Sequence, residues 1–226
     1  MWATLLDLVL PRTCPGCGSG VPWCDTCAAE LDGRPRRVIP PPSEEDSELP
    51  PAYAMSRYRG PVRAAVIAAK EHGRRDLPGL LGVSLGAALA RLASVAVITA
   101  PLWLVPAPTR PAAARRRGGD PMTLMARTAA PILQSAGHRT GVSPCLFTGR
   151  GARDSVGLDA AARRANLEGR IRWRESGAPP PGAAVVLVDD VLTTGATAAA
   201  ASRFLRARGH PVQAVLTLAA VPALSR

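Results

Sequence analysis

The sequence has 226 residues, of which 47% are hydrophobic and 20% are charged, a composition that supplies a folded core and excludes a wholly disordered chain. Its formal net charge of +11 comes from 28 basic residues, and all of them except Lys70 are arginine. Arginine pairs well with phosphate, but a GC-rich coding sequence also produces an excess of arginine and alanine, so charge alone does not establish a polyanionic ligand. The length permits one domain of ordinary size and one small satellite.

The first ten residues are apolar, but Asp7 interrupts them and Pro11 ends them after about half of a membrane span. They lack the basic start of a secretion signal, so we expect a short helix that packs on the body of the protein. No other run approaches the ~18 apolar residues of a membrane helix without a charge or a proline. The sequence therefore predicts a soluble, cytoplasmic protein without membrane insertion.

Four cysteines form two C-x2-C pairs, Cys14 with Cys17 and Cys24 with Cys27, separated by six residues. Together the pairs supply the four sulfur ligands that structural Zn2+ prefers. Two disulfides and a redox-active C-x2-C are the alternatives, of which the first needs an export signal and the second a preceding strand. Because all four ligands come from the protein, we expect structural rather than catalytic zinc. The fifth cysteine, Cys145, is predicted to be buried and inert.

The segment from Ile39 to Pro51 is rich in proline and acidic residues and has little to bury, which is typical of a linker. Beyond it, helical patterns alternate with short apolar runs. This alternation predicts an α/β fold with a mostly parallel sheet flanked by helices. The predicted division is an N-terminal helix and zinc ribbon at 1–38, a linker at 39–52 and a larger domain at 53–226.

Periodicity and helix-breaking residues place the elements of the larger domain. We expect helices where apolar residues recur at helical spacing, and strands where short apolar runs end at proline, glycine or charge. The expected helices are 61–71, 78–92, 121–136, 158–167 and 195–208, and the expected strands are 102–105, 183–188 and 212–218.

The most informative segment runs from Val185 to Thr197, where a dense apolar strand leads to Asp189, Asp190 and a threonine-rich turn. A helix N-terminus offers unpaired N–H groups to a phosphate, and Gly195 lets the backbone approach the phosphate oxygens. The two carboxylates, expected where the strand ends, can accept hydrogen bonds from ribose hydroxyls. An acidic strand end before an ordinary threonine-capped helix is the alternative. The expected phosphate-binding residues are Thr193, Thr194, Gly195, Ala196 and Thr197.

A second basic segment contains Arg115, Arg116 and Arg117, which can pair with pyrophosphate oxygens or with a nucleic-acid backbone. A solvated basic loop is the alternative interpretation of this segment. Lys70 is a further candidate for a phosphate contact, because it is the only lysine in the chain.

The segment from Val185 to Thr197 resembles the phosphoribosyl pyrophosphate signature of type I phosphoribosyltransferases. The whole chain resembles the ComF family, in which a four-cysteine ribbon precedes such a domain. Gly119, Asp120 and Ser155 depart from the residues usual in that family, and these departures concern the finer ligand contacts. The further segments that match, in order, are Tyr58–Gly60, Lys70–Gly73, Val105–Pro108, Arg115–Asp120, and Arg163 with Asn166.

The resemblance implies a type I phosphoribosyltransferase-like fold and a site for phosphoribosyl pyrophosphate with Mg2+. It implies that the ribose lies at Asp189 and Asp190 and the 5-phosphate at the turn 193–197. With the basic residues added, the implied pyrophosphate site comprises Pro106, Ala107, Arg115, Arg116, Arg117 and Lys70.

Two classes of function remain open. The first is transfer of ribose 5-phosphate to an unknown nitrogen acceptor, with Mg2+ and basic residues stabilising the leaving pyrophosphate. The second, implied by the ComF resemblance, is a non-catalytic accessory of DNA uptake in competence that binds single-stranded DNA or docks a competence helicase. The aromatic content of 4% counts modestly against base stacking. A regulator that binds the ribosyl ligand without turnover would use the same site.

Overall fold

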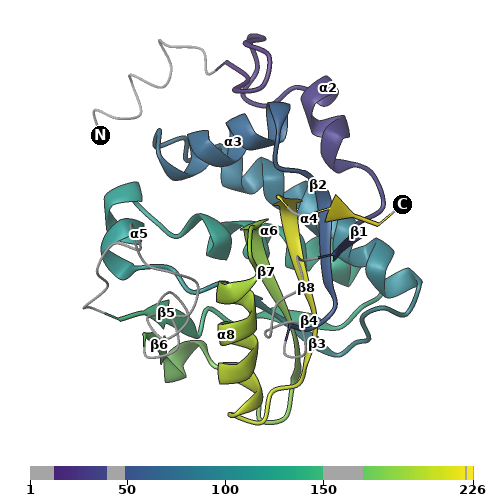
Figure 1. The fold of residues 1–226 in the computed structure, drawn as a ribbon, viewed down its shortest axis with the longest axis vertical. Coiled ribbons are helices and arrows are strands. Elements are labelled where there is room, and N and C mark those ends of the chain that lie inside the picture. Colours follow the sequence, from purple (N-terminus) through teal and green to yellow (C-terminus); the bar gives the residue numbers. More distant parts are fainter. Residues whose placement is uncertain (1–12, 40–48, 150–169, 222, 226) are drawn as a thin grey trace.

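The computed structural model describes residues 13–39, 49–149, 170–221 and 223–225, which form a seven-stranded sheet and its covering helices (Figure 1). The strand order is β4-β3-β7-β8-β2-β1-β9. Strands β4, β3, β7, β8 and β2 pair in parallel, whereas β1 pairs antiparallel with both β2 and β9. Strands β5 and β6 form a separate antiparallel pair. The strands are β1 (Arg36–Ile39), β2 (Ala52–Arg57), β3 (Leu102–Pro106), β4 (Thr140–Val142), β5 (Leu146–Thr148), β6 (Ile171–Trp173), β7 (Ala184–Leu192), β8 (Val212–Ala220) and β9 (Ala223–Leu224).

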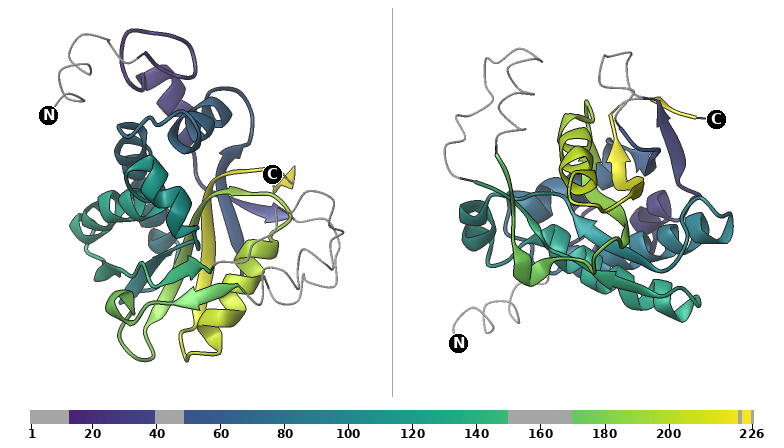
Figure 2. Two further views of the ribbon diagram at one scale, coloured as in Figure 1. Left: turned by 90° about the vertical axis from the view of Figure 1, so that its left-hand side faces the viewer. Right: turned by 90° about the horizontal axis from the view of Figure 1, so that it is seen from below.

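Helices cover both faces of the sheet, as the two side views show (Figure 2). Helices α3, α4 and α6 pack on one face, and α8 packs on the other with the β5–β6 pair. The helices are α2 (Asp25–Ala28), α3 (Gly60–Lys70), α4 (Leu77–Ser94), α5 (Pro111–Arg117), α6 (Pro121–Ser135) and α8 (Ala196–Arg206), with short 3-10 turns η1 (Ala29–Leu31) and η2 (Glu175–Gly177).

The central strand β7 contributes to a core on each face of the sheet. Val186 and Val188 belong to the buried cluster on the α3, α4 and α6 side, whereas Val185 and Leu187 belong to the cluster on the α8 side. Successive side chains of a strand point to opposite faces, so a parallel strand covered on both sides must be apolar at every position. This requirement explains the unbroken apolar run that precedes Asp189.

Helix α4 is long and apolar enough, by length and composition alone, to cross a membrane, and half of it is buried inside the fold. It packs along α6 at Gly82 and Gly86. A Cβ atom at Gly82 would lie 2.8 Å from the backbone oxygen of Met125, and one at Gly86 would lie 2.9 Å from the side chain of Ile132. The apolar composition of α4 is therefore accounted for by its place in the core.

The predicted fold class is confirmed, with a mostly parallel sheet flanked by helices and four cysteines close together near the N-terminus. The predicted helices at 61–71, 78–92, 121–136 and 195–208 and the predicted strands at 102–105 and 212–218 are present with small shifts of their ends. The strand predicted at 183–188 is present but continues to Leu192. The sequence did not predict β1, β2, β4, β5, β6, β9 or α5. Strand β1 spans the boundary expected at residue 38 and pairs with β2. The helices expected at 1–10 and 158–167, and linker residues 40–48, lie outside the described residues.

We expect the α4–α6 contact to be sensitive to side-chain volume. Gly82→Val should lower the free energy of unfolding by about 1–3 kcal/mol, because the added atoms meet the backbone of α6 and force the helices apart. Gly79 lies in the same helix, and a Cβ there meets nothing within 4 Å, so Gly79→Val is the matched control. Urea unfolding of the three proteins measures the difference, and equal stability of the two variants would contradict this packing.

Candidate functional site

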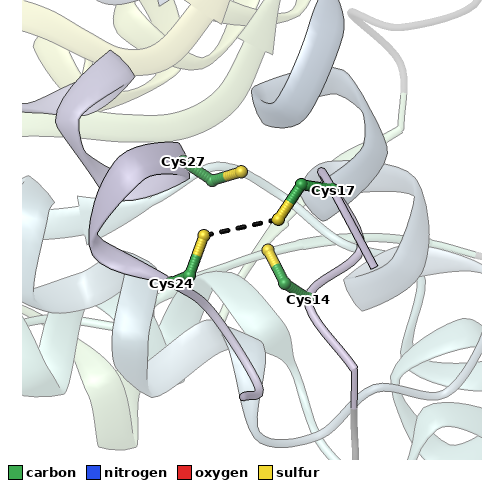
Figure 3. A group of neighbouring side chains, drawn as sticks. All are labelled: Cys14, Cys17, Cys24 and Cys27. Carbon is green, nitrogen blue, oxygen red and sulfur yellow. Dashed lines mark hydrogen bonds between the residues drawn. The ribbon is translucent and has the colours of Figure 1, made fainter. Parts of the chain in front are cut away.

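The four cysteines of the two C-x2-C pairs come together at the N-terminal end of the described chain. Their Sγ atoms all lie within 4.8 Å of one another, with 3.5 Å between Cys17 and Cys24. Figure 3 shows the four side chains pointing toward a common centre. Cys14 and Cys17 lie on a turn in which the amide of Gly18 donates to the Cys14 carbonyl oxygen, and α2 begins directly after Cys24.

The chemistry of the cysteine cluster fits a thiophilic cation. Burial disfavours the Cys14 thiolate, but hydrogen bonds from the backbone of Cys24, Gly16 and Cys17 outweigh it and lower the pKa of Cys14 to about 6. Burial, together with hydrogen bonds to the neighbouring thiols, raises the pKa of Cys27. Four converging sulfurs cannot all ionise without a compensating cation, and Zn2+ accepts four thiolates in a tetrahedron with Zn–S distances of about 2.3 Å. The donor set and its spacing therefore fit zinc.

The cysteine cluster is attached to the main body by Arg74, in the loop between α3 and α4. The Arg74 guanidinium donates to the carbonyl oxygens of Thr13 (2.8 Å) and Pro22 (3.1 Å), on either side of the first cysteine pair. It also pairs with Asp76 at 2.7 Å. Pro61 of α3 packs so closely on Gly16 that a Cβ at Gly16 would lie 2.7 Å from it. The cysteine cluster therefore packs on α3 and is hydrogen-bonded to the loop that follows α3.

The two adjacent carboxylates lie inside β7 rather than at its end. The prediction that the strand ends at residue 188 is wrong, because the pairing with β8 continues from Asp189↔Thr217 to Leu192↔Ala220. Alternation along the strand gives the two side chains different surroundings. Asp190 is 4% exposed and contacts α3, whereas Asp189 lines a small hollow beside the N-terminus of α8.

Lys70, the last residue of α3, forms an ion pair with Asp190, with 2.6 Å between Nζ and Oδ2. Burial lowers the pKa of Lys70, but attraction to Asp190 and then to Asp189 outweighs burial and raises the pKa above its usual value. Lys70 therefore stays protonated and compensates the buried charge of Asp190. The contact of Lys70 with a phosphate remains a prediction; in the structure its ammonium pairs with Asp190.

The small hollow beside Asp189 has a volume of about 40 Å³ and contains most of the predicted phosphate turn. Thr193, Gly195, Ala196 and Thr197 line it, while Thr194 lies exposed beside it and its hydroxyl accepts from the amide of Ala196 at 3.4 Å. Gly195 has a φ of +82°, a left-handed conformation that a residue with a side chain adopts only with strain. The first turn of α8 lines this hollow with Ala196, Thr197 and Ala198, and the first amides of a helix have no partner within the helix.

The pKa of the Asp189 carboxyl is shifted from its ordinary value. Burial, followed by repulsion from Asp190, raises the pKa of the Asp189 carboxyl to about 8, against the opposing attraction of Lys70. One Asp189 oxygen accepts from the amide of Asp190 at 2.8 Å. A donor of further hydrogen bonds, or a cation, would offset the cost of burying this carboxylate.

A larger cleft of about 530 Å³ opens beside α5 and the start of α6. Arginine dominates its wall, and Asp120 is the only acidic residue among the described residues that line it. Asp120 is already committed as the N-cap of α6, since it accepts from the Met122 amide and from the hydroxyls of Thr109 and Thr123. The lining arginines are Arg74, Arg75, Arg115, Arg117, Arg127 and Arg174.

The predicted pyrophosphate residues divide between the cleft and its surroundings. Pro106, Arg115 and Arg117 line the cleft, whereas Ala107, Arg116 and Lys70 do not. The Ala107 amide instead donates to the Val188 carbonyl oxygen at 2.8 Å, which joins the end of β3 to β7.

Arg115, Arg116 and Arg117, predicted to contact pyrophosphate, form the last turn of helix α5, and Gly118 follows them in the left-handed conformation. Arg117 donates through Nε to the Lys70 carbonyl oxygen at 2.7 Å, and Arg75 donates through Nε to the Arg117 carbonyl oxygen at 3.0 Å. These two bonds fasten α5 to the end of α3. The predicted positions Ser155, Arg163 and Asn166 lie outside the described residues.

Sequence reasoning missed Arg75, Arg127, Arg174 and Phe147 in the cleft. They come from separate segments, and none belongs to a recognisable motif, so only the fold brings them together. Cys145 was predicted correctly, since it is fully buried and burial raises its pKa to about 12.

No protein-family model and no curated protein matches the sequence. Among solved structures, one match is a hypoxanthine phosphoribosyltransferase from Staphylococcus aureus, with 13% sequence identity and a TM-score of 0.34. The match covers 62% of this chain and 61% of that one, so this chain spans less than two thirds of the enzyme's length. A similarity at this level does not identify a shared activity or a shared site.

The raised pKa of Asp189 predicts how stability depends on pH. The folded state holds the proton more tightly than the unfolded state, whose pKa is near 3.8, so stability is fully present below that pH and is lost as pH rises through about 8. Asp189→Asn cannot ionise, so its free energy of unfolding should exceed that of wild type near pH 8 by more than it does near pH 5. Urea unfolding at several pH values measures this, with the exposed Asp32→Asn as control. Parallel wild-type and Asp189→Asn curves would refute the shift.

Proposed function

We propose that the protein binds 5-phosphoribosyl pyrophosphate with Mg2+ at the edge of the sheet where β7 leads into α8. The observation that carries the proposal is a single strand, turn and helix that presents a carboxylate, several hydroxyls and a helix N-terminus around one hollow. A phosphate suits the helix end because the N–H groups and the helix dipole both favour negative charge there. The resemblance to the ComF family agrees with this assignment and supplies the identity of the ligand.

In the proposed complex the 5-phosphate occupies the hollow at Thr193, Thr194, Gly195, Ala196 and Thr197. The ribose hydroxyls donate to Asp189 and Asp190, which removes the cost of leaving those carboxylates buried with few partners. Asp190 already holds Lys70 at 2.6 Å, so the ribose must share that carboxylate with Lys70 or displace it. Lys70 would then be free to turn toward the pyrophosphate.

The pyrophosphate would face the arginine-lined cleft. Arg115 and Arg117 line the cleft and offer guanidinium groups that pair with phosphate oxygens through two hydrogen bonds at once. Mg2+ bound with the pyrophosphate would neutralise part of its charge. In a transfer reaction, a nitrogen lone pair attacks C1 of the ribose and the C1–O bond breaks, so pyrophosphate leaves with the electron pair. A regulator without turnover would use the same contacts and omit this step.

Ligand affinity should depend on one carboxylate and one hydroxyl of this site. Asp190→Asn removes a charged acceptor, so it should weaken binding of phosphoribosyl pyrophosphate by roughly tenfold or more. Thr197→Val removes a hydroxyl donor and should also weaken binding. Thr128→Val on α6 removes a hydroxyl that bonds only to its own helix and serves as the matched control. Calorimetry with and without Mg2+ measures the affinities. Equal binding by wild type and both site variants would eliminate the proposed site.

We further propose that Cys14, Cys17, Cys24 and Cys27 bind one structural Zn2+. The support is the convergence of the four sulfurs within 4.8 Å and the ionisation conflict among them. All four positions of a tetrahedral ion would be filled by the chain, so the ion would have no open position for a substrate.

Metal analysis of the purified protein should find about one equivalent of zinc per chain. Cys24→Ser should lose most of it, whereas Cys145→Ser, which changes a buried cysteine outside the cluster, should retain it. A chelator should increase hydrogen exchange around the cysteine pairs and leave the central strands protected, because metal binding stabilises such small units. Full retention of zinc by Cys24→Ser would refute the assignment.

A further inference from the structure

The arginine-lined cleft contains two arginines that the proposed pyrophosphate contacts do not include. Besides Arg115 and Arg117, the cleft is lined by Arg127 of α6 and by Arg174, which follows β6. Both side chains are exposed, and Arg127 makes no hydrogen bond or ion pair with any described residue. The Arg174 guanidinium lies 5.4 Å from the centre of the Phe147 ring, a cation–π contact, and no described residue accepts a hydrogen bond from it.

The same cleft offers an apolar surface for a flat ring. Leu124, Leu146 and Phe147 line it together with Pro144, and its volume of about 530 Å³ falls within the range of small-molecule sites. The acidic side chain that lines it, Asp120, is engaged as a helix cap and offers little to the N–H donors of a neutral base. Guanidinium groups around an apolar wall instead suit a ring that carries a carboxylate, which Arg binds through two parallel hydrogen bonds.

We infer that the second substrate of this protein is a heteroaromatic carboxylic acid, held by Arg127 and Arg174 with its ring against Phe147. The inference rests on the proposed function, because it assigns the acceptor of the same reaction. An unprotonated ring nitrogen donates its lone pair to C1 of the ribose while the C1–O bond to pyrophosphate breaks. A pyridine-type nitrogen, as in nicotinate, carries no proton and needs no general base, whereas an N–H nitrogen, as in orotate, must pass its proton to an oxygen of the leaving pyrophosphate.

Two matched pairs of compounds test the inference on the full chain, orotate with uracil and nicotinate with nicotinamide. The members of each pair differ by a carboxylate. Ligand-observed NMR titration, with the protein alone and with Mg2+ and pyrophosphate added, measures their affinities. In at least one pair the acid should bind about tenfold more tightly than its neutral partner, as expected for a paired rather than an absent carboxylate. Arg127→Gln and Arg174→Gln should each remove most of that preference. Arg139→Gln has the same change of charge outside the cleft and should leave the preference intact.

Equal affinity for acid and neutral compound in both pairs, or an acid preference that survives both cleft substitutions, would overturn the inference. Displacement of the bound acid by a single-stranded DNA oligonucleotide that binds more tightly would also overturn it, since the cleft would then be a nucleic-acid site. The two proposals fail separately. An acid preference without binding of phosphoribosyl pyrophosphate would eliminate the proposed function and leave the cleft as a site for the acid but not for a second substrate. Binding of phosphoribosyl pyrophosphate without an acid preference would eliminate the acceptor class alone.

Discussion

The ion pair between Lys70 and Asp190 is the constraint on which the arrangement of the site depends. Asp190 is 4% exposed at the edge of the central sheet, and an unpaired carboxylate at such a position costs several kcal/mol. Lys70 supplies the compensating charge at 2.6 Å, so α3 must end where its last residue reaches β7. Arg117 then bonds to the Lys70 carbonyl oxygen, which sets the position of α5 and of the arginines that line the cleft.

The loop that follows Lys70 extends this constraint to the cysteine cluster. Within two adjacent residues, Arg74 bonds to the chain on both sides of the first cysteine pair and Arg75 bonds to the end of α5. The cluster, the ion pair and the cleft are therefore joined through one short segment instead of through a separate domain interface. Leu31, just after the second cysteine pair, is fully buried in the same core as α3 and α4. A structural ion in the cluster would thus stabilise the segment that holds both halves of the site.

The sequence predicted the parts of the fold and site that are local in the chain. The strand, turn and helix around Asp189 and Gly195 follow one another directly, so their pattern could be recognised without knowing the fold. The length of β7 was underestimated because the strand continues through two acidic residues, which only the long pairing with β8 stabilises. The ion pair of Lys70 with Asp190 joins residues distant in sequence, and Arg115 and Arg174 line one cleft although they are distant in sequence. No local signal indicates such an arrangement.

The positions of the basic residues bear on why the chain contains so many arginines. A GC-rich coding background would raise the number of arginines, but it would act equally on all parts of the surface. Six arginines nevertheless line one cleft whose only described acidic residue caps a helix, while the single lysine lies on a buried carboxylate. Lysine suits the position beside Asp190, because a compact ammonium on a flexible chain can approach one oxygen closely. Planar guanidinium groups instead suit a ligand with several oxygens. The position of the lysine therefore follows the chemistry of its partner, and the arginines of the cleft would suit the ligand proposed above.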